Sequence, residues 1–252
     1  MPDNVKKAGV IRVATDPSYP PFTSIAGDGK TVVGFDADMA HAIAETLGLK
    51  IEFVPTSFDA IIPALSAGKV DMAMSSIGDT KKREVVVDYA TYYWNGTLMV
   101  VPVGNPKDIK ANMACGARIG VIRGSLQQST FLPSQAPACK QAGQAAPIGK
   151  AYQTGPQAQL ALSSGRIDGV MEDAPTVLDV VKKQPATFSS AGPLTRNPNP
   201  GGVAFPKGSK LADPVSKAIN ALIKNGAYHD TLDTWNLSAI LIETSQINGA
   251  VS

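Results

Sequence analysis

The sequence predicts an α/β protein in which parallel sheets are covered by helices. Short apolar runs alternate with amphipathic segments of helical periodicity between residues 10 and 74. The same alternation begins again near Ile119. Of the 252 residues, 44% are hydrophobic and 17% are charged, which is the balance of a globular protein.

Composition also limits the partners of the chain. The net charge is only +2, so no broad basic field favours nucleic acid as a partner. No run of about 18 apolar residues predicts a membrane-spanning helix. The polar start, Met1-Pro2-Asp3-Asn4, shows no secretory leader, which fits either a cytosolic protein or one whose leader has been removed.

The first predicted strand covers residues 10–14 and ends in a loop with three prolines, residues 15–22. Such a loop is stiff, because each proline fixes φ and removes a donor. The loop places Asp16, Tyr19 and Phe22 at the carboxyl end of the strand, the edge at which open α/β sheets bind ligands.

Strands and helices then alternate. Apolar spacing and helix-ending glycines predict helices over 36–47 and 57–65, and strands are expected over 50–54 and over the short apolar run 70–74. The stretch 75–83 follows the last of these strands. Its small residues, with Arg83 beyond them, can direct backbone N–H groups and a guanidinium at a small anion.

An aromatic patch, residues 89–94, follows and favours a core over a pocket. A strand is expected over 98–103, and the strand-then-loop pattern restarts at 119–122. Next, Gly124-Ser125 is expected at the start of a helix, where it forms either an anion site or only a cap.

A helix over 157–163 and a strand over 167–171 precede two adjacent carboxylates, Glu172 and Asp173. The pair could hold an ammonium, although N-capping of the next helix is the favoured alternative. The Gly- and Pro-rich stretch 189–202 predicts a crossing between domains. A strand over 203–205 and helices over 213–223 and 228–235 follow, and the tail 243–252 is expected to fray.

Cysteine and histidine are sparse. Cys115 and Cys139 fit one structural disulfide or two unrelated buried thiols, and the sequence leaves both open. His41 and His229 lie far apart, without the spacing of metal ligands, so no metal site is predicted.

Taken together, the motifs resemble the polar amino-acid binding proteins of bacterial ATP-driven importers (extracellular solute-binding proteins, family 3). The resemblance covers residues 10–238 and implies the periplasmic binding protein type II fold. In that fold, two α/β lobes are joined by a two-strand hinge, with a ligand cleft between them. The first lobe would be 1–97 with 199–252, and the inserted second lobe 98–198. The motifs that carry the resemblance are Thr15–Phe22, Gly34–Asp38, Phe58–Leu65, Gly68–Asp71, Ser75–Arg83, Gly165–Asp168 and Trp235–Leu237.

The resemblance assigns roles in the first lobe to residues that match the family motifs. Arg83 matches the arginine that clamps the ligand α-carboxylate, and Gly78 the position whose N–H binds the same group. Ser76 matches a position that contacts the α-amino group. Tyr19 and Phe58 match the aromatic walls around the ligand side chain.

The remaining assignments concern selectivity and the second lobe. Asp16 and Ser75 lie where the family selects the ligand side chain. Ser125 and Leu126 match a loop that caps the carboxylate, although Leu126 departs from the usual threonine and offers only its N–H. Asp173 matches the carboxylate that holds the α-ammonium.

The resemblance therefore implies the substrate-binding component of an ABC importer, which closes on an amino acid or a derivative and delivers it to a membrane permease. It implies a monomer without a cofactor or catalytic residues, in the periplasm or exported and tethered, with its signal peptide removed and with Cys115 bonded to Cys139. The alternatives are a cyclohexadienyl dehydratase-like enzyme, using Glu172 or Asp16 as acid or base, and the ligand-binding domain of a sensor receptor.

Overall fold

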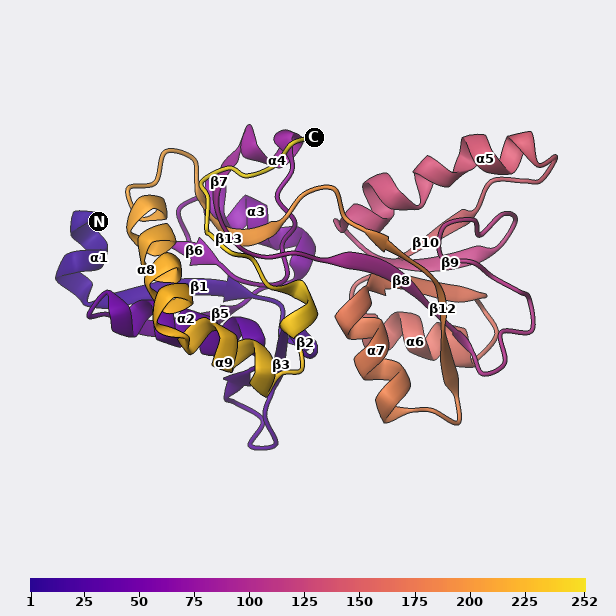
Figure 1. Cartoon of the computed structure of the whole chain (residues 1–252), viewed down its shortest axis with the longest axis horizontal. Helices are drawn as coiled ribbons and strands as arrows, with labels where there is room; N and C mark the ends of the chain where they lie inside the picture. Colours follow the sequence, from indigo (N-terminus) through magenta and orange to yellow (C-terminus); the bar gives the residue numbers. More distant parts are fainter. The chain divides into compact units, whose positions relative to one another are not determined.

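The computed structural model describes residues 1–252, apart from the side chain of Asn4. The chain forms two compact units. Unit 1 comprises Met1–Trp94 and Pro198–Ser252, and unit 2 comprises Asn95–Asn197. The chain therefore passes between the units twice, and unit 2 is an insertion in unit 1 (Figure 1).

Unit 1 is built on a five-stranded sheet with the order β5-β1-β6-β13-β7. The first three of these strands are parallel, and β13 runs antiparallel to both of its neighbours. A smaller sheet, β2-β3-β4, has the turn at Gly27–Lys30 between its last two strands. The bounds are β1 Val10–Thr15, β2 Ser18–Tyr19, β3 Thr23–Ile25, β4 Val32–Val33, β5 Lys50–Pro55, β6 Met72–Ala73, β7 Val87–Tyr93 and β13 Gly201–Pro206.

Helices cover both faces of the unit 1 sheet (Figure 1). Neighbouring strand residues point to opposite faces, so Val13 packs with α2 and α8 while Ala14 packs with α3. Both faces are apolar for this reason, as expected of parallel strands buried on two sides. The helices of unit 1 are α1 Asp3–Ala8, α2 Phe35–Thr46, α3 Phe58–Ser66, α4 Lys81–Glu84, α8 Ala212–Asn225, α9 Ala227–Thr234 and the short η3 Ser238–Ile240.

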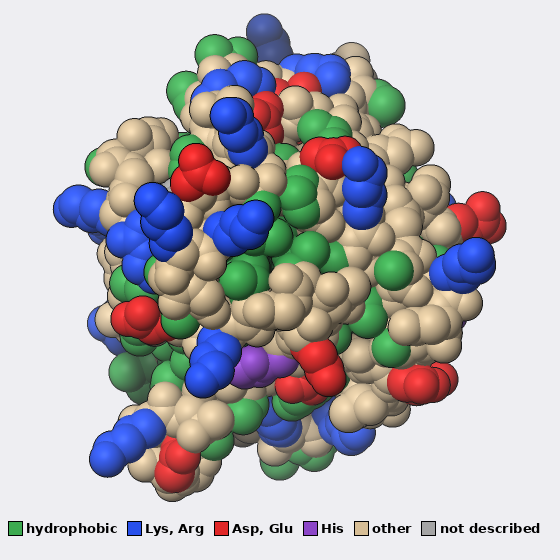
Figure 2. Space-filling view, turned by 90° about the vertical axis from the view of Figure 1, so that its left-hand side faces the viewer, with side chains coloured by type: hydrophobic (Ala, Val, Ile, Leu, Met, Phe, Trp, Pro, Cys, Tyr) green, Lys and Arg blue, Asp and Glu red, His purple; other side chains and the backbone are tan. Residues whose placement is uncertain are grey.

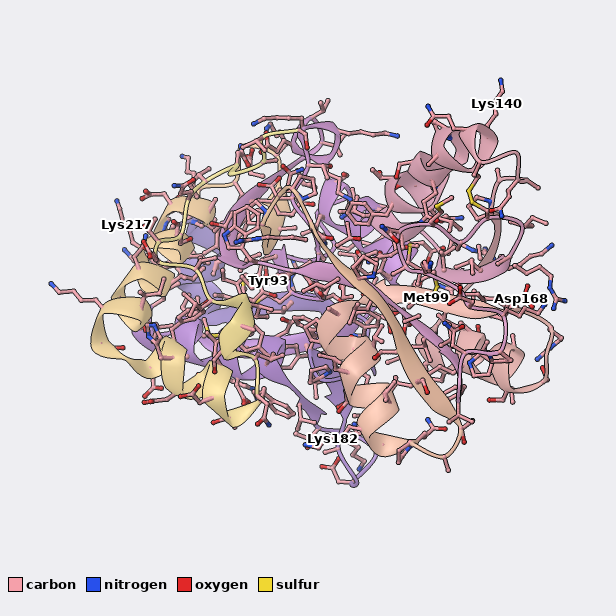
Figure 3. The ribbon with its side chains drawn as sticks, turned by 45° about the vertical axis from the view of Figure 1, so that its right-hand side comes forward. Tyr93, Met99, Lys140, Asp168, Lys182 and Lys217 are labelled. Atoms are coloured by element: carbon pink, nitrogen blue, oxygen red, sulfur yellow. A yellow bond between two sulfur atoms is a disulfide. The ribbon has the colours of Figure 1, made fainter. Side chains whose placement is uncertain are left out.

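The aromatic patch belongs to β7 and lies in the core. Tyr89, Tyr92 and Tyr93 are buried, so the core interpretation is confirmed for these residues, whereas Trp94 is half-buried. Figure 3 shows Tyr93 inside unit 1. Its ring leaves no room for a side chain at Gly201, where a Cβ would lie 1.9 Å from a ring carbon.

Unit 2 repeats the architecture with the sheet order β10-β9-β11-β8-β12. The first three strands are parallel, and β8 runs antiparallel to β11 and β12. Helices α6 and α7 cover one face, while η1 and the loops around it cover the other. The bounds are β8 Gly96–Pro102, β9 Arg118–Ile122, η1 Gln127–Phe131, η2 Pro133–Gln135, α5 Ala136–Gln141, β10 Ile148–Tyr152, α6 Gly155–Ser163, β11 Gly169–Asp173, α7 Ala174–Lys183 and β12 Phe188–Arg196.

A disulfide joins Cys115, in the loop before β9, to Cys139 in α5. The expectation of one structural disulfide is therefore confirmed, and the alternative of two unrelated thiols is wrong. The bond ties α5, which lies at the end of a run of short helical turns, to the loop that leads into β9.

Charged side chains lie mainly at the surface, with both signs interspersed on the face of unit 1 in Figure 2. The buried Asp168 is paired, because Arg118 and Lys107 contact its carboxylate at 2.7 Å each. Figure 3 labels Asp168 in unit 2. These bonds hold the pKa of Asp168 well below its usual value, so its carboxylate has a structural role. In the part of the chain that the structure describes, no helix combines the length and apolar character needed to cross a bilayer.

One expectation about local structure is wrong. The tail 243–252 does not fray: it lies along β7 and ends near α4 (Figure 1). The stretch 189–202 does contain the predicted crossing, between Asn197 and Pro198, but its residues 189–196 belong to β12, which pairs with β8. In both places polar side chains and strand-edge hydrogen bonds order a segment of loop-like composition.

Candidate functional site

The turn after β6 has an unusual backbone that is fixed by buried hydrogen bonds. Ser76 adopts a left-handed conformation with φ 48°, which is uncommon outside glycine. Its N–H donates to Asp36 Oδ2 at 2.9 Å, and its hydroxyl lies 3.2 Å from the Tyr93 hydroxyl. These contacts stabilise the uncommon backbone conformation of Ser76.

Asp36 is the centre of this arrangement. Its carboxylate is fully buried and accepts hydrogen bonds from the Tyr92 hydroxyl at 2.6 Å and from the N–H of Ser76. Thr23 Oγ1 lies 3.3 Å from the same carboxylate. These hydrogen bonds offset the cost of burying the carboxylate, so Asp36 supports the turn from inside the core.

Arg83 lies on α4, the short helix that follows the turn. Thr80 caps this helix by accepting the Arg83 N–H. The guanidinium is half-buried, donates to the Gly78 carbonyl at 2.8 Å and lies beside Tyr89. The loop therefore orients the guanidinium through its own backbone. The structure brings Gly78 and Arg83 together, as a shared carboxylate site would need.

A second group of predicted residues meets at the carboxyl ends of β1 and β6. The Asp16 N–H donates to Ser75 Oγ at 3.0 Å, and Asp16 Oδ2 accepts the Phe58 N–H at 3.1 Å. Both Asp16 and Ser75 are buried, while the Phe58 side chain is half-buried. Tyr19, also half-buried, stacks on the buried ring of Phe22, with the two ring centroids 6.2 Å apart.

In unit 2, Ser125 and Leu126 lie between β9 and η1. Ser125 Oγ accepts the Gln128 N–H at 3.2 Å, so its hydroxyl acts as a cap. The expected helix is the five-residue π-helical segment η1, Gln127–Phe131. An anion at Ser125 and Leu126 would therefore be bound by individual backbone N–H groups rather than by the terminus of a regular α-helix.

Asp173 ends β11 and is buried. Asp173 occupies the N-cap position of α7, but its side chain makes no capping hydrogen bond there, so the N-capping interpretation holds for its position and not for its carboxylate. Instead, Gln127 Nε2 on η1 donates to Asp173 Oδ1 at 2.8 Å. Gln127 is a residue that sequence reasoning missed. The only sign of this role in the sequence is a side-chain amide two residues after Ser125. Patterns of apolar residues give no information about such a polar contact.

Glu172 and Asp173 point to opposite faces of the sheet, because successive strand residues alternate. Glu172 lies on the α6 side, and a Cβ on Gly155 would lie 2.7 Å from Glu172 Oε1. The two adjacent carboxylates therefore do not act together on one ligand. Within the described residues, neither Glu172 carboxyl oxygen has a hydrogen-bond partner. Burial, with a smaller effect from Asp173, raises the pKa of Glu172 to about 8.

The raised pKa of Glu172 predicts a pH-dependent stability that Glu172→Gln removes. The folded state retains the proton that the unfolded state loses above its usual pKa of 4.5, so wild-type stability falls as pH rises from 4.5 to about 8. Glutamine stays neutral but leaves an amide unpaired. We expect the variant to be more stable than wild type at pH 9 by roughly 2 kcal/mol. Denaturant unfolding at pH 5 and pH 9 measures this difference.

The matched control is Glu45→Gln, which neutralises an exposed carboxylate on α2. It should leave the pH dependence of unfolding as in the wild type. Equal pH dependence in the wild type and in Glu172→Gln would contradict the assignment.

Among the described residues, no group of three or more His, Cys, Asp or Glu side chains could hold a metal ion. The candidate site therefore consists of oriented charges and backbone groups in each unit.

Comparison with known proteins gives the family. The sequence profile of bacterial extracellular solute-binding proteins, family 3, matches residues 11–238. The L-arginine-binding protein of Pseudomonas aeruginosa is 31% identical over 234 residues, covering 89% of this chain and 87% of that protein. A putative ABC transporter arginine-binding protein of Escherichia coli (strain K12) is 30% identical over 233 residues, covering 90% and 91%.

Solved structures agree with the two-lobe α/β architecture. An ancestral arginine-binding protein bound to arginine is 35% identical with a TM-score of 0.81, covering 90% of this chain and 98% of that chain. An ancestral amino acid-binding protein that is a precursor of cyclohexadienyl dehydratase is 30% identical with a TM-score of 0.81, covering 92% and 98%. The predicted fold class is confirmed, and the chain belongs to the bacterial extracellular solute-binding proteins, family 3.

Proposed function

We propose that this protein binds an α-amino acid and delivers it to the membrane permease of an ABC importer. One observation carries the proposal. Two oriented groups of opposite charge lie beyond the carboxyl ends of the parallel strands, a guanidinium in unit 1 and a carboxylate in unit 2. Arg83 follows β6 in unit 1, and Asp173 ends β11 in unit 2. A zwitterionic amino acid presents the complementary pair of charges.

The α-carboxylate would bind Arg83 and the Gly78 N–H, with the N–H groups of Ser125 and Leu126 as further donors. The contact between Arg83 and the Gly78 carbonyl supports this role, because it fixes the direction of the guanidinium before ligand arrives. A planar guanidinium also matches a carboxylate in geometry, which an ammonium does not.

The α-ammonium would bind Asp173 and the Ser76 hydroxyl. Gln127 holds the Asp173 carboxylate by one oxygen at 2.8 Å, which supports a fixed acceptor for a cation. A buried carboxylate gains most from a cationic partner, because the surrounding dielectric is low.

The ligand side chain would lie against Tyr19 and Phe58, with Asp16 and Ser75 setting selectivity. The Asp16 carboxylate accepts from the Ser18 hydroxyl at 2.6 Å and from the N–H of Phe58. A carboxylate offers about four lone-pair sites, so it can accept further donors. We therefore favour a cationic or amide-bearing side chain, and the arginine-binding relatives support L-arginine as the first candidate.

The disulfide supports an oxidising compartment, and with the family it favours the periplasm or an exported, tethered form of the protein. Binding rather than catalysis is the proposed activity, because the curated relatives are amino-acid-binding proteins. The dehydratase alternative keeps one supporting observation, the similarity to the precursor of cyclohexadienyl dehydratase.

A thermal-shift panel tests the proposal. L-Arginine, lysine, histidine, glutamine and cystine are each added at up to 1 mM, roughly 100 times a Kd of 10 μM, with aspartate as the anionic control. A ligand bound only by the folded protein stabilises it by about 2.7 kcal/mol at 100 times Kd, so the melting temperature should rise by several degrees.

An increase for one or more amino acids, confirmed by titration calorimetry, is the expected result. No increase with any amino acid would overturn the proposal. In a separate assay, loss of prephenate or arogenate over time in the presence of the protein would identify the enzyme alternative.

A further inference from the structure

The tail segment, residues 245–252, completes the edge of the unit 1 sheet. β7 is an edge strand, and the tail segment pairs with its outer side. Thr91 N–H donates to the Gln246 carbonyl at 3.0 Å, and Asn248 N–H donates to the Tyr89 carbonyl at 3.1 Å. An edge strand needs such a partner or cover.

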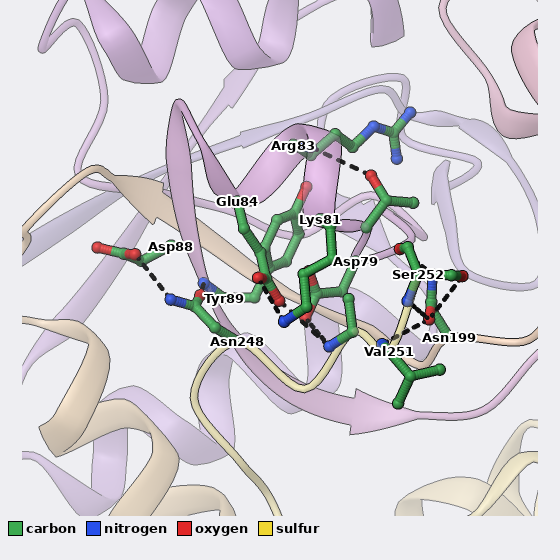
Figure 4. Close-up of polar contacts among 12 residues, drawn as sticks. Asp79, Lys81, Arg83, Glu84, Asp88, Tyr89, Asn199, Asn248, Val251 and Ser252 are labelled. Carbon is green, nitrogen blue, oxygen red and sulfur yellow. Dashed lines mark hydrogen bonds and ion pairs between the residues drawn. The ribbon is translucent and has the colours of Figure 1, made fainter.

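The last residues continue past β7 to the segment that carries Arg83 (Figure 4). The Ala250 N–H donates to Asp79 Oδ2 at 3.1 Å and to Glu84 Oε1 at 3.2 Å. The Lys81 N–H donates to the Ser252 carbonyl at 2.9 Å. The tail segment therefore contacts three residues that bracket Arg83.

Asn199 fastens the end of the tail segment to the strand that re-enters unit 1. Its Oδ1 accepts from the N–H groups of Val251 at 2.8 Å and Ser252 at 3.2 Å, and its Nδ2 donates to the Ser252 carbonyl at 2.9 Å. Asn199 is buried. One amide side chain thus satisfies three backbone groups of the tail segment.

Charged side chains beside Arg83 also contact the tail segment. Glu84 pairs with Lys81 at 2.9 Å and also accepts from the tail segment. Asp79 is fully buried, and burial, with the Glu84 charge as a smaller cause, raises the pKa of Asp79 to about 7. Near neutral pH, Asp79 is therefore partly protonated, so Asp79 and Glu84 repel each other less than two carboxylates would.

We propose that Asn199 and residues 250–252 are positioning residues for ligand binding, which act by holding α4 so that Arg83 points at the ligand carboxylate. The proposal rests on the proposed function. The competing explanation is that the tail segment only covers the edge of β7 and supports stability.

A matched pair of asparagines separates the two explanations. Asn199 holds the end of the tail segment beside α4, whereas Asn220 holds its beginning, with Oδ1 accepting the Ser245 N–H at 2.8 Å. Both Asn199→Ala and Asn220→Ala remove amide contacts to the same segment, so both should lower the melting temperature. Only Asn199→Ala removes the contacts beside Arg83.

Calorimetric titration uses L-arginine and L-argininamide, which lacks the α-carboxylate. We expect Asn199→Ala to raise the Kd for arginine about 10-fold and to leave that for argininamide within twofold. Asn220→Ala should change neither Kd. The double variant with Arg83→Ala should bind arginine no more weakly than Arg83→Ala alone, because both substitutions act on one contact.

Hydrogen exchange of the ligand-free protein gives a second readout. Asn199→Ala should speed exchange of the amides of residues 79–85, and Asn220→Ala should not. The inference would be overturned if Asn199→Ala left the exchange of residues 79–85 unchanged. It would also be overturned if Asn199→Ala weakened the binding of arginine and argininamide equally, or if Asn199→Ala and Asn220→Ala weakened arginine binding equally. If Arg83→Ala leaves arginine binding intact, the proposed ligand clamp fails, while the exchange measurement still decides whether the tail segment holds α4.

Discussion

Arg83→Ala is expected to raise the Kd for the bound amino acid about 100- to 1000-fold, equivalent to about 2.7–4 kcal/mol. The substitution removes the only proposed cationic partner of the ligand carboxylate. Removing one partner of a charge pair in a desolvated site weakens the binding free energy by about 2–5 kcal/mol. Because Arg83 is half-buried at the surface of α4, the fold should persist. Calorimetric titration measures Kd, and thermal unfolding checks the fold.

Two further variants serve as comparisons for the affinity of Arg83→Ala. Arg83→Lys keeps the charge but not the planar guanidinium, so its affinity should fall between wild type and alanine. Arg166→Ala removes an exposed arginine that donates to Ser164 Oγ at 2.9 Å within its own loop, and it should bind ligand like wild type. Wild-type affinity in Arg83→Ala would show that the carboxylate is held elsewhere.

The double variant Cys115→Ser with Cys139→Ser should lower the free energy of unfolding of unit 2 by about 3 kcal/mol. The disulfide closes a loop with a sequence separation of 24, and a cross-link of this length restricts the unfolded chain by about that amount. Both cysteines lie in unit 2, so the loss should appear in the transition of that unit. Denaturant unfolding, followed by hydrogen exchange in each unit, measures it.

Reductant provides the control for this experiment. It should shift wild-type unfolding toward that of the double serine variant and should leave the variant itself unchanged. If both proteins unfold alike without reductant, the cross-link contributes nothing to stability.

Much of the fold could be predicted because burial on two faces imposes a regular pattern. Val13 and Ala14 pack on opposite faces of one sheet, and such runs of apolar residues mark a parallel strand. The short strand β10 was missed, since its residues are almost all exposed and carry no apolar signal. Helix α1 was missed because its six residues are too few to show a period.

Candidate site residues could be proposed from the sequence, but the hydrogen-bond partners that hold them in the structure could not. Asp173 was a candidate, yet its contact with Gln127 spans 46 residues and depends on where η1 packs. Asn199 lies in a loop-like sequence, and its partners Val251 and Ser252 are more than 50 residues away. Hydrogen bonds between distant segments follow from tertiary packing, which local composition does not encode.

The insertion of unit 2 into unit 1 also has a consequence for the order in which the chain acquires its structure. β13 lies between β6 and β7 but is synthesised after all of unit 2, so the first segment of unit 1 waits with its sheet incomplete. Unit 2 is one continuous segment and closes shorter loops, which favours faster folding. We expect unit 2 to become protease-resistant first during refolding, and unit 1 to set the rate at which the protein becomes able to bind its ligand.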